Sequence, residues 1–368
     1  MARESLSGLG APAARGFRAP DGILEAVAEP HRYQLQSDAA NRLIGELLEA
    51  AQIPADRRGW YQQLLTTVLK LHEDGASVAD IKITNSALKE LRYAYKVFAP
   101  WRSTRKVTVF GSARTPHDAD AARVAQEFGR LMVAAGWMVI TGAGGGIMGA
   151  AQAGAGGERS FGLNIRLPFE QEANPSIAAD PKLITFKYFF TRKLFLVREA
   201  SGVALFPGGF GTMDEAWEVM TVMQTGKAAI IPLVLVEAGP KPYWRIWDRW
   251  LGTLVERRLV DPADTAFYRI VDTAEEAVGE LTTFYRVYHS ARIVRDRLVL
   301  RLARPLADAQ LAELQRGFQD ILKGPAEQAP GPVPEEASEF PELPRLILPF
   351  NRASYSRLRQ LIDAVNTY

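Results

Sequence analysis

The chain has 368 residues, and its 44 Lys and Arg residues against 42 Asp and Glu residues give a net charge of +2. Hydrophobic residues make up 47% and charged residues 23%, the balance of a globular protein whose core needs no disulfides or structural metal. The absence of cysteine excludes disulfide frameworks, thiolate zinc sites, iron–sulfur clusters and cysteine nucleophiles. The balanced charge argues against broad binding to nucleic acid, and no apolar run reaches the ~18 residues of a membrane helix.

The first hundred residues are predicted to form a tail and a helical extension. Residues 1–35 carry several Gly and Pro residues without a periodic pattern, which predicts a disordered or irregular tail. This tail has no apolar segment typical of a secretory signal, so we expect a cytoplasmic protein. Apolar residues at helical spacing over residues 36–100 predict an all-helical extension without a catalytic group. Its predicted helices run from Ser37 or Asp38 to Ala50, onward from Pro54, and from Asn85 to Phe98.

Residues 101–290 alternate short apolar strands with helical stretches. This order predicts an α/β domain, a Rossmann-like parallel sheet with helices on both faces. The predicted strands are Lys106–Phe110, Trp137–Thr141, Arg159–Ile165, Leu183–Thr185, Val203–Phe206 and Ile230–Val236. The predicted helices are Ala119–Ala135, Gly146–Ala155, Arg192–Ala200 and Asp214–Gln224.

Residues 291–368 are predicted to form a small C-terminal α+β extension. Its pattern is βαβα, with strands at Arg297–Leu302 and Arg345–Phe350 and helices at Asp308–Leu322 and Tyr355–Val365. The proline-rich stretch 324–344 is interpreted as a linker or irregular crossover. We expect this unit to extend the central sheet or to dock on a partner.

A glycine-rich turn joins the strand Val203–Phe206 to the next helix, and Gly208, Gly209 and Gly211 lie within it. Glycines let backbone N–H groups approach a ligand without interference from a Cβ atom. Thr212 is placed to cap the helix, whose positive end favours an anion. A tight turn with an ordinary cap is the alternative, but three glycines in four positions exceed what such a turn needs. The turn therefore predicts a phosphate site.

A second glycine-rich loop follows the strand Trp137–Thr141. Its glycines match the G-x-G-x-x-G spacing of dinucleotide sites, a weak signal when it stands alone. The loop follows the second strand of the domain, and the next strand ends in Asn164 and Arg166 without an acid for a ribose hydroxyl, so NAD is not expected. Two such loops in one sheet indicate a nucleotide across the carboxyl ends of the strands. The candidate residues here are Gly144, Gly145, Gly146 and Met148.

Charged side chains accompany the first glycine turn. Asp214 and Glu215 lie in the first turn of the helix, where the helix dipole alone accounts for Asp214. Arg192 and Lys193 lie on the crossover helix that leads to the strand before the turn, although a solvated face is the simpler interpretation of this pair. A carboxylate and a guanidinium beside a predicted phosphate site indicate a catalytic or substrate-binding site. The chain's four histidines show no metal-ligand spacing.

The turn Pro207-Gly-Gly-Phe-Gly-Thr-Met-Asp-Glu215, with Thr191-Arg192-Lys193 and Gly144-Gly-Gly-Ile-Met-Gly149, resembles the LOG (Lonely Guy) family. These Rossmann-like proteins are nucleoside 5′-monophosphate phosphoribohydrolases, long mislabelled as lysine decarboxylases. The resemblance covers about residues 104–285, and with its extensions the chain is similar to the larger bacterial nucleotide nucleosidases. It implies hydrolysis of the N-glycosidic bond of AMP, a related purine or pyrimidine nucleotide, or a cytokinin riboside monophosphate. The products are the free base and ribose 5-phosphate.

The resemblance also implies roles for individual residues. Glu215 would stabilise an oxocarbenium ion and orient a water, and Arg192 would hold the sugar or phosphate and position the leaving base. Backbone amides of Gly209, Gly211 and Thr212 would bind the phosphate. Further candidates for substrate binding are Gly208, Gly144, Gly145, Gly146, Met148, Lys193, Glu218, Ser112 and Arg114. We expect no cofactor and no metal, and the resemblance implies a homo-oligomer, a dimer or a higher assembly.

Two other interpretations remain, and a third, lysine decarboxylation, fails on its chemistry. The same cradle could hold a nucleotide or a molybdenum-cofactor-like phosphate without turnover, as a binding or carrier protein. A DNA-processing protein of similar fold would need a basic surface that the charge balance does not favour. Lysine decarboxylation would need pyridoxal phosphate on a lysine, and Lys193 next to Arg192 is a poor candidate for that bond.

Overall fold

The computed structural model describes residues 33–168, 172–334, 336 and 339–368. Most of the predicted tail over residues 1–35 lies outside this range. The described residues fall into two compact units, one of residues 33–92 and one of residues 93–368.

The smaller unit contains three helices. These are α1 (Asp38–Ala50), α2 (Ala55–Glu73) and α3 (Val78–Phe98), whose last turns belong to the larger unit. The side chain of Ser37 accepts a hydrogen bond from the N–H of Ala40 at 3.2 Å, which caps α1 as predicted. Helix α3 begins well before the predicted Asn85, because Ser77 and Asp80 cap it reciprocally at 3.0 and 3.2 Å.

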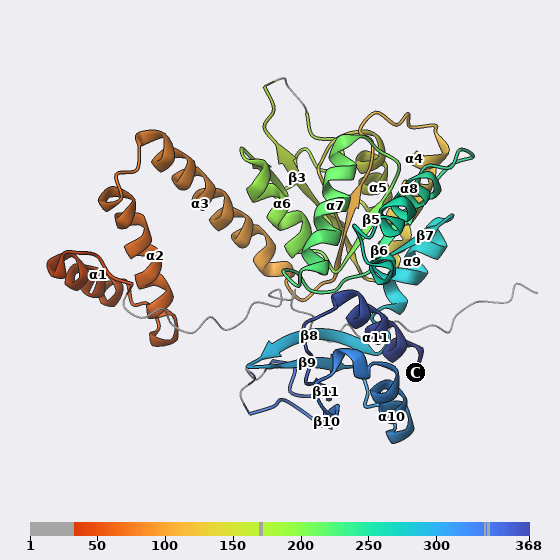
Figure 1. The fold of residues 1–368 in the computed structure, drawn as a ribbon. Coiled ribbons are helices and arrows are strands. Elements are labelled where there is room, and N and C mark those ends of the chain that lie inside the picture. The colour runs from red at the N-terminus through yellow and green to blue at the C-terminus, as the bar shows by residue number, and fades with distance from the viewer. Residues whose placement is uncertain (1–32, 169–171, 335, 337–338) are drawn as a thin grey trace, which may run out of the picture. The chain divides into compact units, whose positions relative to one another are not determined.

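The larger unit is built on a parallel sheet of seven strands in the order β4-β3-β2-β1-β5-β6-β7 (Figure 1). The strands are β1 (Lys106–Phe110), β2 (Met138–Thr141), β3 (Ser160–Ile165), β4 (Leu183–Phe186), β5 (Gly202–Leu205), β6 (Leu233–Val236) and β7 (Tyr268–Val271). The Rossmann-like α/β class predicted from the sequence is confirmed. Strand β7 was not predicted.

Helices cover both faces of this sheet. On one face, α4 (Asp120–Ala134), α5 (Gly146–Ala155) and α9 (Ala274–Thr283) share a hydrophobic core with strand residues such as Val107 and Val109. Side chains alternate along a strand, so Thr108 points to the other face, where its hydroxyl donates to Leu196 O at 2.7 Å. That face carries α6 (Phe189–Arg198) and α7 (Phe210–Gln224), and α8 (Trp244–Glu256) packs on α7.

The chain reverses its direction of travel across the sheet at β1. From β1 it moves outward through β2 and β3 to β4, and it then returns to β5 on the other side of β1. The loops that follow β1 and β5 therefore leave in opposite directions. In open α/β sheets this switch point leaves a crevice at the carboxyl ends of the strands, where ligands bind.

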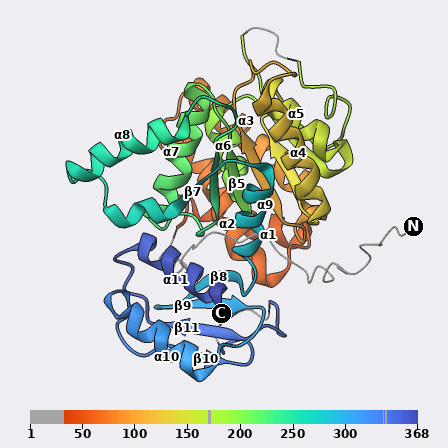
Figure 2. The same cartoon turned by 90° about the vertical axis from the view of Figure 1, so that its right-hand side faces the viewer.

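The C-terminal residues form a second sheet of four antiparallel strands in the order β10-β11-β9-β8 (Figure 2). Its elements are β8 (Tyr288–Val294), β9 (Arg297–Leu302), α10 (Asp308–Gly317), β10 (Glu327–Ala329), β11 (Arg345–Leu348) and α11 (Tyr355–Thr367). The expectation that this unit extends the central sheet is wrong. A tight turn joins β8 to β9, and such a hairpin has to be antiparallel. Strand β8 precedes the predicted βαβα pattern, and β10 lies inside the stretch interpreted as a linker.

Helix α11 joins the two sheets. The side chain of Asn366 accepts hydrogen bonds from the N–H groups of Val287 and Tyr288, both at 2.9 Å. The buried guanidinium of Arg359 pairs with Glu280 of α9 at 3.0 Å. These contacts explain why residues 93–368 form one compact unit.

The described residues include no helix that is both long enough and apolar enough to span a lipid bilayer.

Helices α4 and α5 pack unusually closely through two glycines. A Cβ atom on Gly129 would lie 2.1 Å from Ala151 O, and one on Gly154 would lie 1.8 Å from Gln126 O. Because α5 begins at the second glycine-rich loop, this close packing also fixes where that loop meets the sheet.

We expect Gly154→Ala to lower the free energy of unfolding by about 1–3 kcal/mol, since the added methyl group meets backbone atoms that have no room to move. The matched control is Gly279→Ala in α9, where a Cβ meets no atom within 4 Å. That change should be neutral or stabilising by up to about 1 kcal/mol, because alanine favours a helix. Urea unfolding of both variants measures the difference, and equal effects would contradict the packing argument.

Candidate active site

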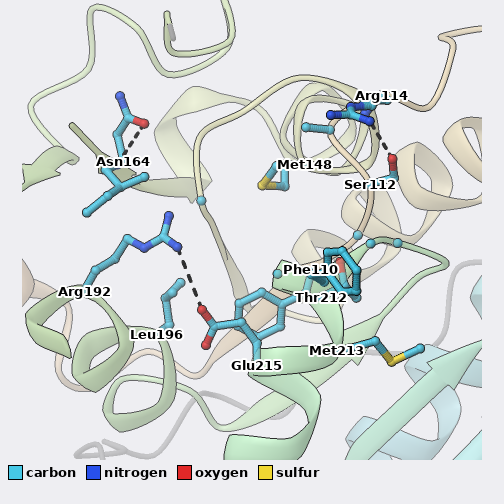
Figure 3. Close-up of a pocket in the computed structure, with 18 of the residues that line it drawn as sticks. Phe110, Ser112, Arg114, Met148, Asn164, Arg192, Leu196, Thr212, Met213 and Glu215 are labelled. Atoms are coloured by element: carbon cyan, nitrogen blue, oxygen red, sulfur yellow. Dashed lines mark hydrogen bonds and ion pairs between the residues drawn. The ribbon is translucent and has the colours of Figure 1, made fainter. Parts of the chain in front are cut away.

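A cleft of about 710 Å³ opens at the carboxyl ends of β1, β2, β3 and β5, where the topology predicts a crevice. Its walls come from the loop after β1, the first residue after β2, the end of β3, helix α6 and the glycine turn that leads into α7. Figure 3 shows Arg192, Glu215, Met148 and Asn164 around this space.

Three loops interlock beneath the cleft through backbone contacts. The N–H of Ser112 donates to Pro207 O at 3.1 Å, and the N–H of Ile147 donates to Ser112 O at 3.0 Å. A Cβ atom on Gly146, whose φ is +56°, would lie 2.3 Å from Ser112 O. A Cβ atom on Gly208 would lie 2.1 Å from the hydroxyl oxygen of Thr212. Glycine is therefore required at Gly146 by the contact between two loops, and at Gly208 by the close approach of Thr212 in the first turn of α7.

Helix α7 starts earlier than predicted. Its N-cap is Gly209, and the N–H groups of Thr212 and Met213 both donate to Gly209 O, at 3.0 and 3.1 Å. The prediction that Thr212 caps the helix is wrong, because Thr212 lies inside the first turn. Its N–H is also engaged, so it is not a ready phosphate donor. The N–H groups of Phe210 and Gly211 are the ones that a helix start leaves without an intrahelical acceptor.

The second glycine-rich loop contributes less to the cleft than its sequence predicts. Gly142 and Met148 line the cleft, whereas Gly144, Gly145 and Gly146 are not among the described residues that line it. Instead, the carbonyl of Gly144 accepts a hydrogen bond from the side chain of Asn174 at 3.0 Å. The small residues of this loop thus serve loop packing and the start of α5. Ser112 and Arg114 do line the cleft, and the hydroxyl of Ser112 accepts from the N–H of Arg114 at 3.1 Å.

Glu215 and Arg192 face each other in the cleft (Figure 3). A guanidinium nitrogen of Arg192 lies 3.9 Å from Glu215 Oε1. Glu215 is only 4% exposed, and its Oε2 accepts no hydrogen bond from the described residues. The Nε atom of Arg192 is likewise buried without such a partner in that part of the chain. Buried polar atoms usually have partners, so these two leave bonding capacity for a ligand or water.

Burial raises the pKa of Glu215 to about 7, although Lys193 and Arg192 act in the opposite direction. The neighbouring acids Glu218 and Asp214 reinforce the rise. Burial also lowers the pKa of Arg192, against the influence of Glu215 and Asp214. A carboxyl group that titrates near neutrality in a cleft is typical of a catalytic acid or base.

Lys193 and Glu218 do not line the cleft with their neighbours. The ammonium group of Lys193 lies 2.7 Å from Asp214, 2.7 Å from Glu218 and 3.5 Å from Glu215 Oε2. Burial lowers the pKa of Lys193, but its hydrogen bonds with Asp214 and Glu218 outweigh that effect, and the net shift is upward. Lys193 thus affects the cleft only indirectly, because its positive charge, 3.5 Å from Glu215 Oε2, lowers the pKa of Glu215.

Two side chains that line the cleft, those of Asn164 and Tyr243, were not predicted as site residues. Asn164 is the penultimate residue of β3 and lines the cleft, and its Oδ1 accepts a hydrogen bond from the N–H of Ile165 at 2.9 Å. Tyr243 stands before α8, far from the glycine turn in sequence, yet its hydroxyl donates to Gly208 O. A polar residue at the carboxyl end of a strand is a signal that could have identified Asn164. No pattern in the sequence connects Tyr243 with the turn.

Among the residues that the structure describes, no cluster of three His, Asp or Glu side chains could hold a metal ion.

Comparisons with known proteins give a family match over part of the chain. Residues 148–281, less than half of the chain, match a family described as possible lysine decarboxylase. No curated protein sequence matches significantly.

Several solved structures match about half of the chain with TM-scores below 0.5. The molybdenum cofactor carrier protein of Chlamydomonas reinhardtii has 19% identity and a TM-score of 0.36, with 49% of this chain and 96% of that chain covered. The molybdenum cofactor binding protein of Rippkaea orientalis gives the same identity, TM-score and coverage. A structural genomics target, TM1055, has 24% identity and a TM-score of 0.34, with 48% and 97% covered.

The raised pKa of Glu215 predicts a pH-dependent cost of stability. Unfolding returns the carboxyl to its ordinary pKa of 4.5, so between pH 4.5 and about 7 the unfolded chain is ionised while the folded protein keeps the proton. Stability from this group is therefore lost as the pH rises through that window. Glu215→Gln removes the titration. Its free energy of unfolding, relative to the wild type, should rise by about 1–3 kcal/mol between pH 4.5 and 8.

Denaturant unfolding of both proteins at several pH values tests this. Parallel stability curves for the wild type and Glu215→Gln would show that Glu215 titrates normally in the folded protein.

Proposed function

We propose that this cleft hydrolyses the N-glycosidic bond of a nucleoside 5′-monophosphate to give the free base and ribose 5-phosphate. The observation that carries the proposal is Glu215: it is buried, its pKa is raised to about 7, and one of its oxygens accepts no hydrogen bond from the described residues. This carboxylate lies one helical turn from a helix start that favours an anion. The motif's resemblance to the LOG family, and the family match over residues 148–281, support the same assignment.

The start of α7 provides the phosphate site in this proposal. The N–H groups of Phe210 and Gly211 have no intrahelical acceptor, and the positive end of the helix dipole favours the negative charge. Gly209 and Gly211 have open space where a Cβ atom would stand, so a phosphate can approach their backbone closely. Binding the phosphate here supplies remote binding energy that positions the ribose.

Cleavage of the N-glycosidic bond then depends on two side chains of the cleft, Glu215 and Arg192. The C1′–N bond breaks with its electron pair on the base nitrogen, and positive charge develops on C1′ and the ring oxygen. Ionised Glu215 stabilises this charge and orients a water, whose oxygen bonds to C1′. The proton released by that water reaches the departing base, so the products are the neutral base and ribose 5-phosphate. Arg192, opposite Glu215, holds the sugar side of the substrate and positions the base.

The residues present do not fit the chemistry that the description lysine decarboxylase implies. That reaction needs pyridoxal phosphate bound to a lysine amine. No lysine is among the described residues that line the cleft, and the amine of Lys193 is engaged by Asp214 and Glu218. A carrier that binds a phosphorylated ligand without turnover remains the second interpretation, and the experiments below separate it from hydrolysis.

A panel of nucleotides and nucleosides tests the substrate class. We expect ribose 5-phosphate release from one or more nucleoside monophosphates such as AMP, GMP, CMP or UMP. The corresponding free nucleosides should react with kcat/KM lower by on the order of 10²-fold or more, since each hydrogen bond to a charged group contributes about 1.5–3 kcal/mol. Equal cleavage of AMP and adenosine would show that the start of α7 does not bind the 5′-phosphate of the substrate. Tight AMP binding without release of ribose 5-phosphate would favour the carrier.

Substitution of the central carboxylate tests the mechanism. Glu215→Gln keeps the shape of the side chain and removes its charge, so turnover should fall on the order of 10²–10³-fold, the usual cost of losing one such electrostatic contact. Affinity for AMP should change far less, because the backbone donors of α7 remain. Asp214→Asn is the matched control, because Asp214 has a 61% exposed side chain and does not line the cleft.

Turnover and AMP affinity of both folded variants decide the question. Near-normal turnover in Glu215→Gln, or an equal loss in Asp214→Asn, would show that Glu215 is not the catalytic carboxylate.

A further inference from the structure

Tyr243 connects helix α8 to the glycine turn before α7. It is the N-cap residue of α8, it lines the cleft, and its hydroxyl donates a hydrogen bond to Gly208 O. Burial raises the pKa of Tyr243, so its hydroxyl remains a donor at neutral pH. This is a contact between the side chain of one element and the backbone of another, 35 residues apart.

The position of Tyr243 is fixed from the end of β6. Glu237, which follows β6 and is 5% exposed, accepts hydrogen bonds from the N–H groups of Tyr243 and Arg245, the latter at 2.9 Å. Arg245 also pairs with Asp272 at 2.7 Å. Through these contacts the carboxylate of Glu237 caps α8 and sets the point from which the tyrosine ring extends.

The bond to Gly208 O controls the orientation of one peptide group. The peptide between Gly208 and Gly209 is trans, so its C=O and N–H point in opposite directions. Fixing the carbonyl of Gly208 therefore fixes the direction of the Gly209 N–H. Both flanking residues are glycines, whose broad conformational freedom would otherwise let this peptide rotate easily. Tyr243 supplies the constraint that the two glycines lack.

We propose that Tyr243 is a positioning residue that orients the Gly208–Gly209 peptide for recognition of the substrate's 5′-phosphate. The inference rests on the phosphate site of the proposed function, to which it adds the N–H of the N-cap residue Gly209 beside those of Phe210 and Gly211. Tyr243 acts through the backbone of the turn and not on the reacting atoms at C1′. It therefore determines how well the cleft distinguishes a phosphorylated ligand from its unphosphorylated counterpart, while the chemistry at Glu215 stays intact.

The test compares Tyr243→Phe with Tyr268→Phe. Tyr268 is the matched control, because its buried hydroxyl donates to Asp248 of the same helix α8 and it does not line the cleft. Calorimetric titration with AMP and with adenosine, at pH 7 on full chains that also carry Glu215→Gln so that AMP is not turned over, gives the two affinities of each protein. The steady-state assays use the same chains without Glu215→Gln. In Tyr243→Phe the Kd for AMP should rise about 3- to 10-fold, the equivalent of one net hydrogen bond, while the Kd for adenosine stays unchanged.

In steady-state assays the same variant should show a raised KM for the monophosphate with kcat nearly unchanged, and Tyr268→Phe should match the wild type in every measurement. Wild-type affinity for AMP in Tyr243→Phe would overturn the inference. So would an equal loss of affinity for AMP and adenosine, since a merely structural role would weaken both. A selective loss of AMP binding in a protein that releases no ribose 5-phosphate would uphold the role of Tyr243 and refute the proposed hydrolysis.

Discussion

Two backbone hydrogen bonds at Ser112 hold the cleft together. Its N–H donates to Pro207 O and its C=O accepts from Ile147 N, so the loop after β1 is bonded to both glycine-rich loops. Parallel pairing of β1 with β2 and β5 brings the three loops to one edge of the sheet but does not fix them beyond the strand ends. The bonds at Ser112 do so, and the close approach of the Ser112 carbonyl leaves no room for a Cβ atom at Gly146. The shape of the cleft thus follows from loops that pack backbone against backbone.

The charged side chains of α6 and α7 beside the cleft form a small cluster of ion pairs. Arg192 and Lys193 face three carboxylates, those of Asp214, Glu215 and Glu218. Of these carboxylates only Glu215 is buried, and burial raises its pKa to about 7. Lys193 works against that shift, so it holds Glu215 nearer its ionised form at neutral pH. A positive charge that developed in the cleft would favour ionised Glu215 further, whereas a phosphate dianion at the start of α7 would oppose it. Substrate binding therefore changes the pKa of Glu215, by an amount that depends on the distance between the bound charges and this carboxylate.

The central sheet was predicted well because β1, β2, β3 and β5 are short apolar runs, each followed within two residues by glycine, proline or a charged residue. Strand β7 and helix α9 were missed, although Thr273 and Glu276 form a capping box that marks the start of α9. The spacing of apolar residues placed Glu215 and Glu218 on the same helix. It could not show that, of these two, only Glu215 lines the cleft, because that depends on how α7 packs against α6. Glycine spacing likewise could not separate the glycines that line the cleft from those that pack under it. Tyr243 and Glu237 escaped prediction because their contacts join segments that are distant in sequence.

Two features that cost stability lie within the cleft. Glu215 is buried with an oxygen that accepts no hydrogen bond from the described residues, and Arg192 has a buried Nε without such a partner there. Each such atom destabilises the folded state by an amount on the order of 1–3 kcal/mol. Buried side-chain atoms without a hydrogen-bond partner also occur elsewhere among the described residues, for example the indole nitrogens of Trp244 and Trp247, which do not line the cleft. Glu215 and Arg192 differ from these two because they are charged and face each other in the cleft. Polar groups left unpartnered in a cleft are typical of functional sites. The unsatisfied carboxylate opposite Arg192, beside a helix start open to anions, is thus the physical reason to place the chemistry at Glu215.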